Sequence, residues 1–410
     1  MKNAILLIVL LVAGLGVGIG GAVYLTSQDD SPKLPPLQQG GEVVLDEQGD
    51  GEDAPKEDVV ESVSITHVET HQMEVGTHRP EILLHEDGSI YLIVVEHEEV
   101  DGVYVRHKAY ELDENMNQVG ESFVVTYSDE YGEGADHRTA IIDDELVVVY
   151  QTLIASDEPV DEDSKGSEGN AESQSLILKR FSLEDGTELD SNPIVAFETD
   201  FEKNNFPDHS LLWNAEKERL LVSTGTYGPA TTVNIREVEL DGDIISTYSY
   251  DTHEDDVGSK IGNSMFWSPE EELLFFNYVG NMNEEDLQIT TLDELYSITD
   301  SVVFEKDGTE EVFPIGVFYY EGLYFVGYIS RPEGDSDMET NPYHPHLMVL
   351  NENFEIIEDF QVSEENGSGH LHPTMIIVDD TLYFAWSKST EQTNGLNTPQ
   401  VQIEEFSLSF

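Results

Sequence analysis

Apolar residues recur along residues 78–410 in short runs that repeat as a unit. Each copy opens with an apolar run, turns, and continues with a second apolar run that few polar residues interrupt. Such runs are typical of strands buried on both faces. The opening runs begin at Pro80, Arg138, His209, Asn263, Pro314 and Pro373. The pattern therefore predicts six copies of one β-unit.

A third strand in each copy leads to a polar hairpin, from which a fourth strand returns. The hairpins include residues 112–115, 183–186, 240–243, 292–294 and 350–353, where Asp, Asn and Gly supply the backbone angles of tight turns. Four antiparallel strands per unit, repeated at about 50–70 residues, are the signature of propeller blades. We therefore predict an all-β chain whose body is a six-bladed β-propeller of four-stranded blades.

The last copy lacks a fourth strand, because the sequence ends with its third strand at residues 401–410. Residues 62–68, just ahead of the first copy, alternate like a strand. We expect this N-terminal strand to pair with the C-terminal one and close the ring, since closure removes two open sheet edges. Cysteine is absent, which excludes disulfides and Cys-type zinc sites.

An uncharged apolar run at residues 4–25 follows Lys2 and is long enough to cross a bilayer as a helix. The positive-inside rule places the body outside the cell. A retained anchor is favoured over a cleaved signal peptide, although residues 20–22 are small enough for cleavage. We divide the chain into residues 1–25 as a transmembrane anchor or signal peptide, 26–60 as an acidic disordered linker, and 61–410 as the propeller.

Acidic residues number 85 against 18 Lys and Arg, a formal charge of -67. Such a chain repels nucleic acid and anionic lipid, so we expect no nucleic acid partner and membrane contact through the N-terminal helix only. Salt screens the self-repulsion, which favours a halophilic protein over a merely acidic secreted one. The expected partners are a carbohydrate or a cell-surface protein, and the propeller is expected to be monomeric.

Long loops are confined to one face of the predicted propeller. Residues 155–173, 225–232, 331–344 and 388–399 join second to third strands there, while the loops of the opposite face are short. We call it the long-loop face. Long loops on one side of a rigid scaffold commonly carry binding, so the ligand is expected at the channel mouth on this face.

Polar side chains gather at that mouth, just ahead of the opening strands and at the ends of second strands. The candidate ligand-binding residues are His78, Arg79, Asp136, His137, Arg138, Asp208, His209, Asn263, Arg331, His370, His372 and Lys388. Basic groups collected in an acidic chain predict an anionic ligand, such as a carboxylate-bearing sugar. Two alternatives stay open: a structural ring of hydrogen bonds between blades, and catalysis.

Metal and cofactor signals are weak. His370 and His372, like His344 and His346, share a face of a strand but bring no third ligand, so no metal site is predicted there. The acidic runs at 161–172 and 333–339 would suit Ca²⁺, with solvated loop tips as the default. No cofactor is expected, because the chain shows no phosphate loop or nucleotide fingerprint.

Residues 78–92, with His-Arg-Pro-Glu-Ile, and residues 372–386, with His-Pro-Thr-Met-Ile, resemble the sialidase-like six-bladed propellers. Those proteins carry an Arg-x-Pro signature on the first strand, whereas here Arg79 directly precedes Pro80 and His78 takes the signature position. Their Asp box is echoed with shifted spacing at residues 182–187. The resemblance implies the fold and a substrate-face role for Arg79.

These features predict an extracytoplasmic, membrane-anchored propeller that acts as a binding or interaction module, or a secreted one if the N-terminus is cleaved. One alternative is a glycoside hydrolase or lyase acting on acidic polysaccharide. It would use Asp136 or Asp208 as acid or base beside Arg79 and Arg138. The other is a purely structural cell-surface protein. The sequence leaves open whether the chain is an enzyme.

Overall fold

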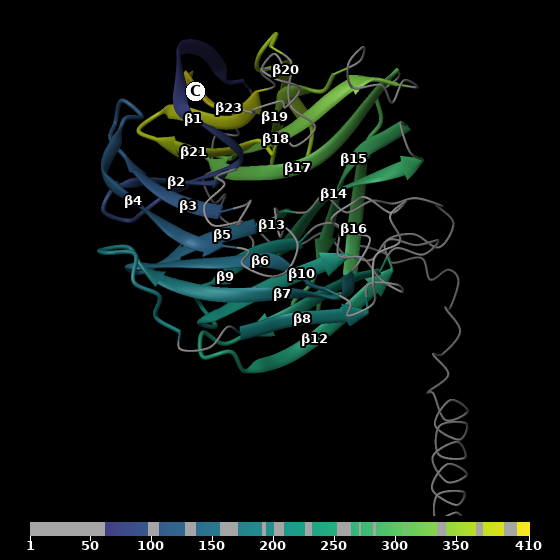
Figure 1. Cartoon of the computed structure of the whole chain (residues 1–410). Coiled ribbons are helices and arrows are strands. Elements are labelled where there is room, and N and C mark those ends of the chain that lie inside the picture. The colour runs from purple at the N-terminus through teal and green to yellow at the C-terminus, as the bar shows by residue number, and fades with distance from the viewer. Residues whose placement is uncertain are drawn as a thin grey trace, which may run out of the picture. The chain divides into compact units, whose positions relative to one another are not determined.

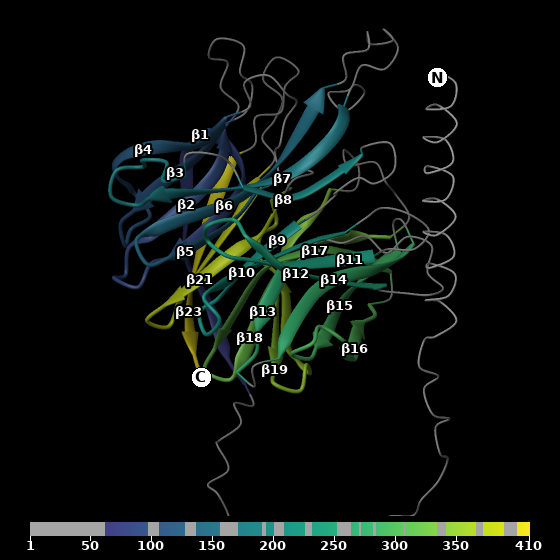
Figure 2. The same ribbon diagram turned by 90° about the horizontal axis from the view of Figure 1, so that it is seen from below.

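The computed structural model describes residues 62–96, 106–127, 137–155, 171–190, 194–200, 209–225, 232–251, 264–269, 272–281, 284–306, 308–333, 342–365, 372–388 and 400–410. These residues form strands β1 to β23, grouped in six antiparallel blades. The predicted all-β, six-bladed propeller of four-stranded blades is confirmed. In Figure 2 the colours pass around the body from purple through teal and green to yellow, so the blades follow chain order.

The long strand β1 (Ser64–Leu84) belongs to two blades. Its first half pairs with β23 (Gln400–Ser409), placing Ile65 opposite Leu408, and its second half pairs with β2 (Ile90–Glu96). Figure 1 shows the purple strand β1 beside the yellow strand β23. The predicted closure of the last blade by the N-terminal strand is therefore confirmed.

The remaining strands complete the blades in order. Blade 1 adds β3 (Arg106–Leu112) and β4 (Gln118–Tyr127) to β1 and β2. Blade 2 is β5 (His137–Ile142), β6 (Glu145–Ala155), β7 (Ala171–Ser182) and β8 (Ile194–Asp200). Blade 3 is β9 (His209–Asn214), β10 (Arg219–Gly225), β11 (Thr232–Val238) and β12 (Ile244–Asp251).

Blade 4 is β13 (Ser264–Trp267), β14 (Leu273–Asn281), β15 (Glu284–Leu292) and β16 (Ile298–Phe304). Blade 5 is β17 (Thr309–Tyr320), β18 (Leu323–Pro332), β19 (His344–Asn351) and β20 (Ile356–Gln361). Blade 6 is β21 (Thr374–Val378), β22 (Thr381–Lys388), β23 and the first half of β1.

Second strands are buried on both faces, as their apolar runs predict. On β2, Leu92 packs with Ile403 of blade 6, whereas its neighbour Ile93 packs with Val148 of blade 2. Successive side chains thus face opposite neighbours, because side chains alternate along a strand. Burying one such side chain contributes about 1.5–3 kcal/mol. Fourth strands are exposed by contrast, and Ile356 on β20 keeps 50% of its surface.

Three of the predicted hairpins, in blades 1, 4 and 5, share one turn. In blade 1, Oδ1 of Asp113 accepts hydrogen bonds from the backbone N–H groups of Asn115 and Asn117 at 2.9 and 2.8 Å. Asp293 and Asn351 make the same pair of contacts in blades 4 and 5. A short side-chain acceptor mimics a backbone turn, which explains why Asp or Asn occupies this position.

Several predictions lie outside the described residues. They are the anchor or signal peptide at 1–25, the linker at 26–60, and most of each long loop. Within the described residues, the structure has no helix that is both long and apolar enough to span a bilayer.

Candidate functional site

The inner strands of blades 1, 2 and 3 bring predicted residues together at one end of the propeller. His137 starts β5, and its nearest charged neighbours include Arg138, Arg79 and His209. His107, from the start of the third strand of blade 1, joins them, its ring centroid lying 4.7 Å from that of His137. We call these five residues, together with Glu81, the mouth cluster.

His137 is held neutral inside this cluster. Its side chain is almost completely buried, and burial, followed by the nearby positive charges, holds its pKa well below the usual value. Both of its ring nitrogens are buried and have no hydrogen-bond partner among the described residues. An unsatisfied buried polar atom costs about 1–3 kcal/mol, so a ligand that bonded the imidazole would recover part of that cost.

Arg138 and Glu81 form the charged pair of the cluster. Nη1 of Arg138 donates to the backbone carbonyl of His137 at 2.6 Å, and its Nε lies 3.9 Å from Oε1 of Glu81. Oε2 of Glu81 accepts a hydrogen bond from the hydroxyl of Thr139. Burial raises the pKa of Glu81 to about 7, although Arg138 and Thr139 both lower it. Near neutral pH the carboxyl therefore holds a proton far more often than an exposed glutamate does.

One edge of the Arg138 guanidinium, which faces Glu81 at ion-pair distance, makes no hydrogen bond to any described residue. Its Nε and Nη2 atoms are buried and make no hydrogen bond within the described part of the chain. These two N–H groups are parallel and form the fork that binds a carboxylate through both oxygens. The cluster therefore contains a donor pair whose geometry suits an anion.

Other predicted residues at this mouth join blades. The backbone N–H of Arg79 donates to the hydroxyl of Ser387 at 2.9 Å, which links blade 1 to blade 6. Nε2 of His209 lies 3.3 Å from the carbonyl oxygen of Val149, which links blade 3 to blade 2. His372 is buried just before β21. The contacts of Arg79 and His209 fit the alternative of a structural ring of hydrogen bonds between blades.

Arg331 and Lys388 end second strands, as predicted, but each is paired with a carboxylate. Nε of the buried Arg331 lies 3.1 Å from Oε2 of Glu310, and its guanidinium stacks 4.2 Å from the ring centre of Tyr343. Lys388 forms an ion pair with Glu365. These two cations are thus largely neutralised within blades 5 and 6.

The other candidates cannot be placed in the cluster. His78 lies on β1, but its side chain is outside the described set. Asp136, Asp208, Asn263 and His370 also lie outside the described residues.

The sequence reasoning missed Glu81 and His107. Glu81 could have been found, because a carboxyl inside the apolar opening run of an inner strand has to be buried beside a partner. His107 gave no such signal. Its position on a third strand becomes significant only when blade 2 packs His137 against it.

No protein family matches the chain, and no curated protein matches its sequence. Among solved structures, a protein of unknown function from Dyadobacter fermentans DSM 18053 is similar, with a TM-score of 0.58 and 10% identity. The match covers 84% of this chain and 99% of that one. Trypanosoma rangeli sialidase gives a TM-score of 0.48 at 12% identity, covering 80% of this chain and 54% of its own. A GH43 β-1,3-galactosidase gives 0.42 at 11% identity, covering 72% and 58%. These likenesses concern the fold alone.

Proposed function

We propose that the chain is an extracytoplasmic binding module whose ligand is an anion, specifically a carboxylate-bearing saccharide, held at the mouth cluster on the long-loop face. The observation that carries this proposal is the buried Nε and Nη2 edge of Arg138, which has no hydrogen-bond partner among the described residues. A ligand carboxylate would accept from both N–H groups. Charge-assisted bonds of this kind are stronger than neutral ones.

The local charge balance supports the same ligand. The whole chain carries -67, yet the groups that act on His137 are Arg138, Arg79 and two histidines. Glu81 neutralises Arg138 only in part near pH 7, because its pKa is about 7. An incoming carboxylate would therefore meet a local positive potential inside an acidic protein.

Binding of uronic-acid and sialyl oligosaccharides, screened on an array and quantified by calorimetry, tests the proposal. Arg138→Lys keeps the charge but loses the fork, and it should weaken binding about tenfold or more. The matched control is Arg180→Lys in the same blade. Arg180 lies on β7 and is paired with Asp190, so binding should stay unchanged. Failure of every acidic saccharide to bind, or equal binding by the Arg138 variant, would refute the proposal.

Glu81 also favours a second candidate, a glycoside hydrolase or lyase acting on acidic polysaccharide. A carboxyl with a pKa of about 7 holds a proton that it can donate at neutral pH, as general acid catalysis requires. Asp136 and Asp208 stay the proposed second carboxyl. Release of reducing ends from polyuronides or sialosides, lost in Glu81→Gln with binding retained, would establish the enzyme. If these saccharides bind but are not cleaved, the binding module stays the proposed function.

The proposed location rests on the predicted anchor at residues 4–25. Protease treatment of intact cells should digest the propeller while leaving cytoplasmic proteins intact. If the chain is extracellular but binds no saccharide, the purely structural cell-surface role is the alternative that stands.

A further inference from the structure

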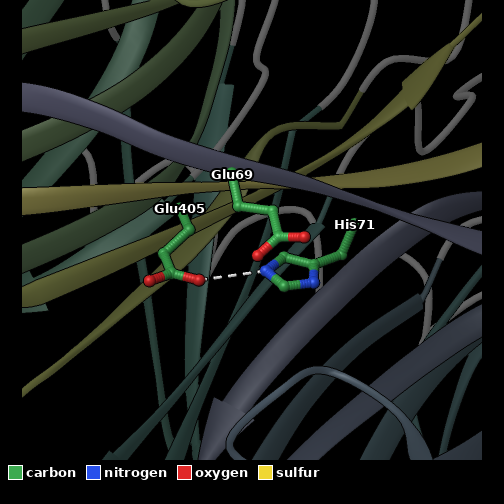
Figure 3. Close-up of side chains that lie close together, drawn as sticks. All are labelled: Glu69, His71 and Glu405. Atoms are coloured by element: carbon green, nitrogen blue, oxygen red, sulfur yellow. Dashed lines mark hydrogen bonds and ion pairs between the residues drawn. The ribbon is translucent and has the colours of Figure 1, made fainter.

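Three potential metal ligands converge where the ring closes. Glu69 and His71 lie on the first half of β1, and Glu405 lies on β23. One ligand atom from each residue lies within 4.8 Å of the other two, and Nε2 of His71 is 3.0 Å from Oε2 of Glu405. Figure 3 shows the three side chains directed toward one another from the two strands.

The register of the closing ladder creates this convergence. An irregularity between His67 and Glu69 shifts the pairing, so that Glu69 lies directly opposite Glu405. His71 follows two residues after Glu69 and therefore shares its face of the strand. Like charges directly opposite each other destabilise a sheet. Two carboxylates paired in this way favour a cation between them, and a divalent ion would balance both.

The surroundings suit an ion that enters from solvent. The side chains of His71 and Glu405 keep 15% and 20% of their surface exposed to solvent, so neighbouring residues hold both in place while an ion can still reach them. The carboxylate of Asp113, at the hairpin of blade 1, is close enough to His71 to interact with it electrostatically. This charge and the strongly acidic chain raise the local concentration of cations.

The opposite face of the same ladder provides a contrast. There Nε2 of His67 lies 3.0 Å from Oε2 of Glu404, and the hydroxyl of Thr70 donates to the same oxygen at 2.5 Å. Nε1 of Trp386 donates to the other oxygen of Glu404 at 3.3 Å. This pair has its hydrogen bonds satisfied and offers one carboxylate, so it has a structural role.

We propose that Glu69, His71 and Glu405 bind a divalent transition-metal ion at the closure of the ring. His71 provides one imidazole nitrogen, each glutamate provides one carboxylate oxygen, and water completes the coordination. An imidazole beside carboxylates suits Zn²⁺ and, more weakly, Mn²⁺, whereas Ca²⁺ and Mg²⁺ prefer sites made of oxygen alone. The ion links the first strand to the last, so its binding stabilises the closed ring.

Calorimetry of the full chain with Zn²⁺, Mn²⁺ and Ca²⁺ in strong salt tests this site, because salt suppresses unspecific binding to an acidic surface. We expect Zn²⁺ to bind more tightly than Mn²⁺, and Ca²⁺ not to compete. His71→Gln should weaken Zn²⁺ binding about tenfold or more, as loss of one ligand requires. The matched control, His67→Gln, should leave it unchanged.

X-ray absorption of the Zn²⁺-loaded wild-type protein gives a readout that needs no variant. It should show one imidazole among oxygen ligands, and the apparent melting temperature should rise with Zn²⁺. Zn²⁺ coordination without imidazole, or equal Zn²⁺ affinity in the His71 variant, would overturn the proposal. Neither outcome depends on Arg138, so the metal site and the saccharide site are tested separately.

Discussion

Replacing Glu81 by Gln probes the mouth cluster through the stability of the protein. Glu81 is 7% exposed and accepts a hydrogen bond from Thr139, while Arg138 lies 3.9 Å away. Glutamine keeps an oxygen for the Thr139 hydroxyl but cannot ionise. The variant therefore removes the titration while largely keeping the packing.

The expected size follows from the pKa of Glu81, which burial raises from 4.5 to about 7. The folded state then binds the proton more tightly than the unfolded state does. The free energy of unfolding consequently falls as pH rises from 4.5 to about 7, and it levels off above that. At about 1.4 kcal/mol per pH unit, this interval amounts to roughly 3 kcal/mol.

Urea unfolding between about pH 5 and pH 8 measures this dependence. Over this pH range, the unfolding free energy of Glu81→Gln should fall by up to about 3 kcal/mol less than that of the wild type. The variant should therefore be the more stable protein at the upper pH. Burial also raises the pKa of Glu311 to about 7, so the variant keeps some dependence. The exposed Glu86→Gln is the control and should follow the wild type. Parallel curves for wild type and Glu81→Gln would refute the account of a buried, ionising carboxyl.

Three further predictions concern the scaffold, all measured by urea unfolding. Gly316→Ala would place its Cβ 2.7 Å from Cα of Thr374 in the next blade, so it should cost about 1–3 kcal/mol; an unchanged midpoint would contradict this close approach. Glu310→Gln breaks the buried pair with Arg331 and should cost about 3–5 kcal/mol, whereas Glu188→Gln, in an exposed pair, should cost less than about 1 kcal/mol; equal losses would contradict the difference in burial. For a chain of charge -67, the midpoint should rise between about 0.1 and 2 M NaCl, and a flat response would contradict the halophilic hypothesis.

Most of the fold was predictable because blade strands carry local signals. A second strand is buried on both faces and reads as one apolar run, and three of the hairpins carry Asp or Asn at the same place in the turn. The closing strand was predictable because the last repeat has no fourth strand of its own. The details of strand register were not predictable. The sequence placed the opening of blade 5 at Pro314, whereas β17 begins at Thr309 and its pairing shifts between Val312 and Gly316.

The candidate site was predictable in position but not in pairing. The repeat placed His137 and Arg138 at the same end of inner strands as Arg79 and His209, and the structure brings them together. The sequence could not show that Arg331 is neutralised, because its partner Glu310 lies on the neighbouring strand in the extension before Pro314. Such side-chain pairings depend on the register between strands, which here is shifted by the irregularity between Val312 and Gly316.

Hydrogen exchange of the backbone amides in β1 and β23 tests the central claim most directly, because the channel mouth requires a closed ring. If residues 64–72 and 400–409 pair as the structure shows, the hydrogen-bonded amides of residues 64–72 should exchange as slowly as those of another fourth strand, β20. Unprotected exchange in residues 64–72, with β20 still protected, would show an unclosed ring and contradict the account.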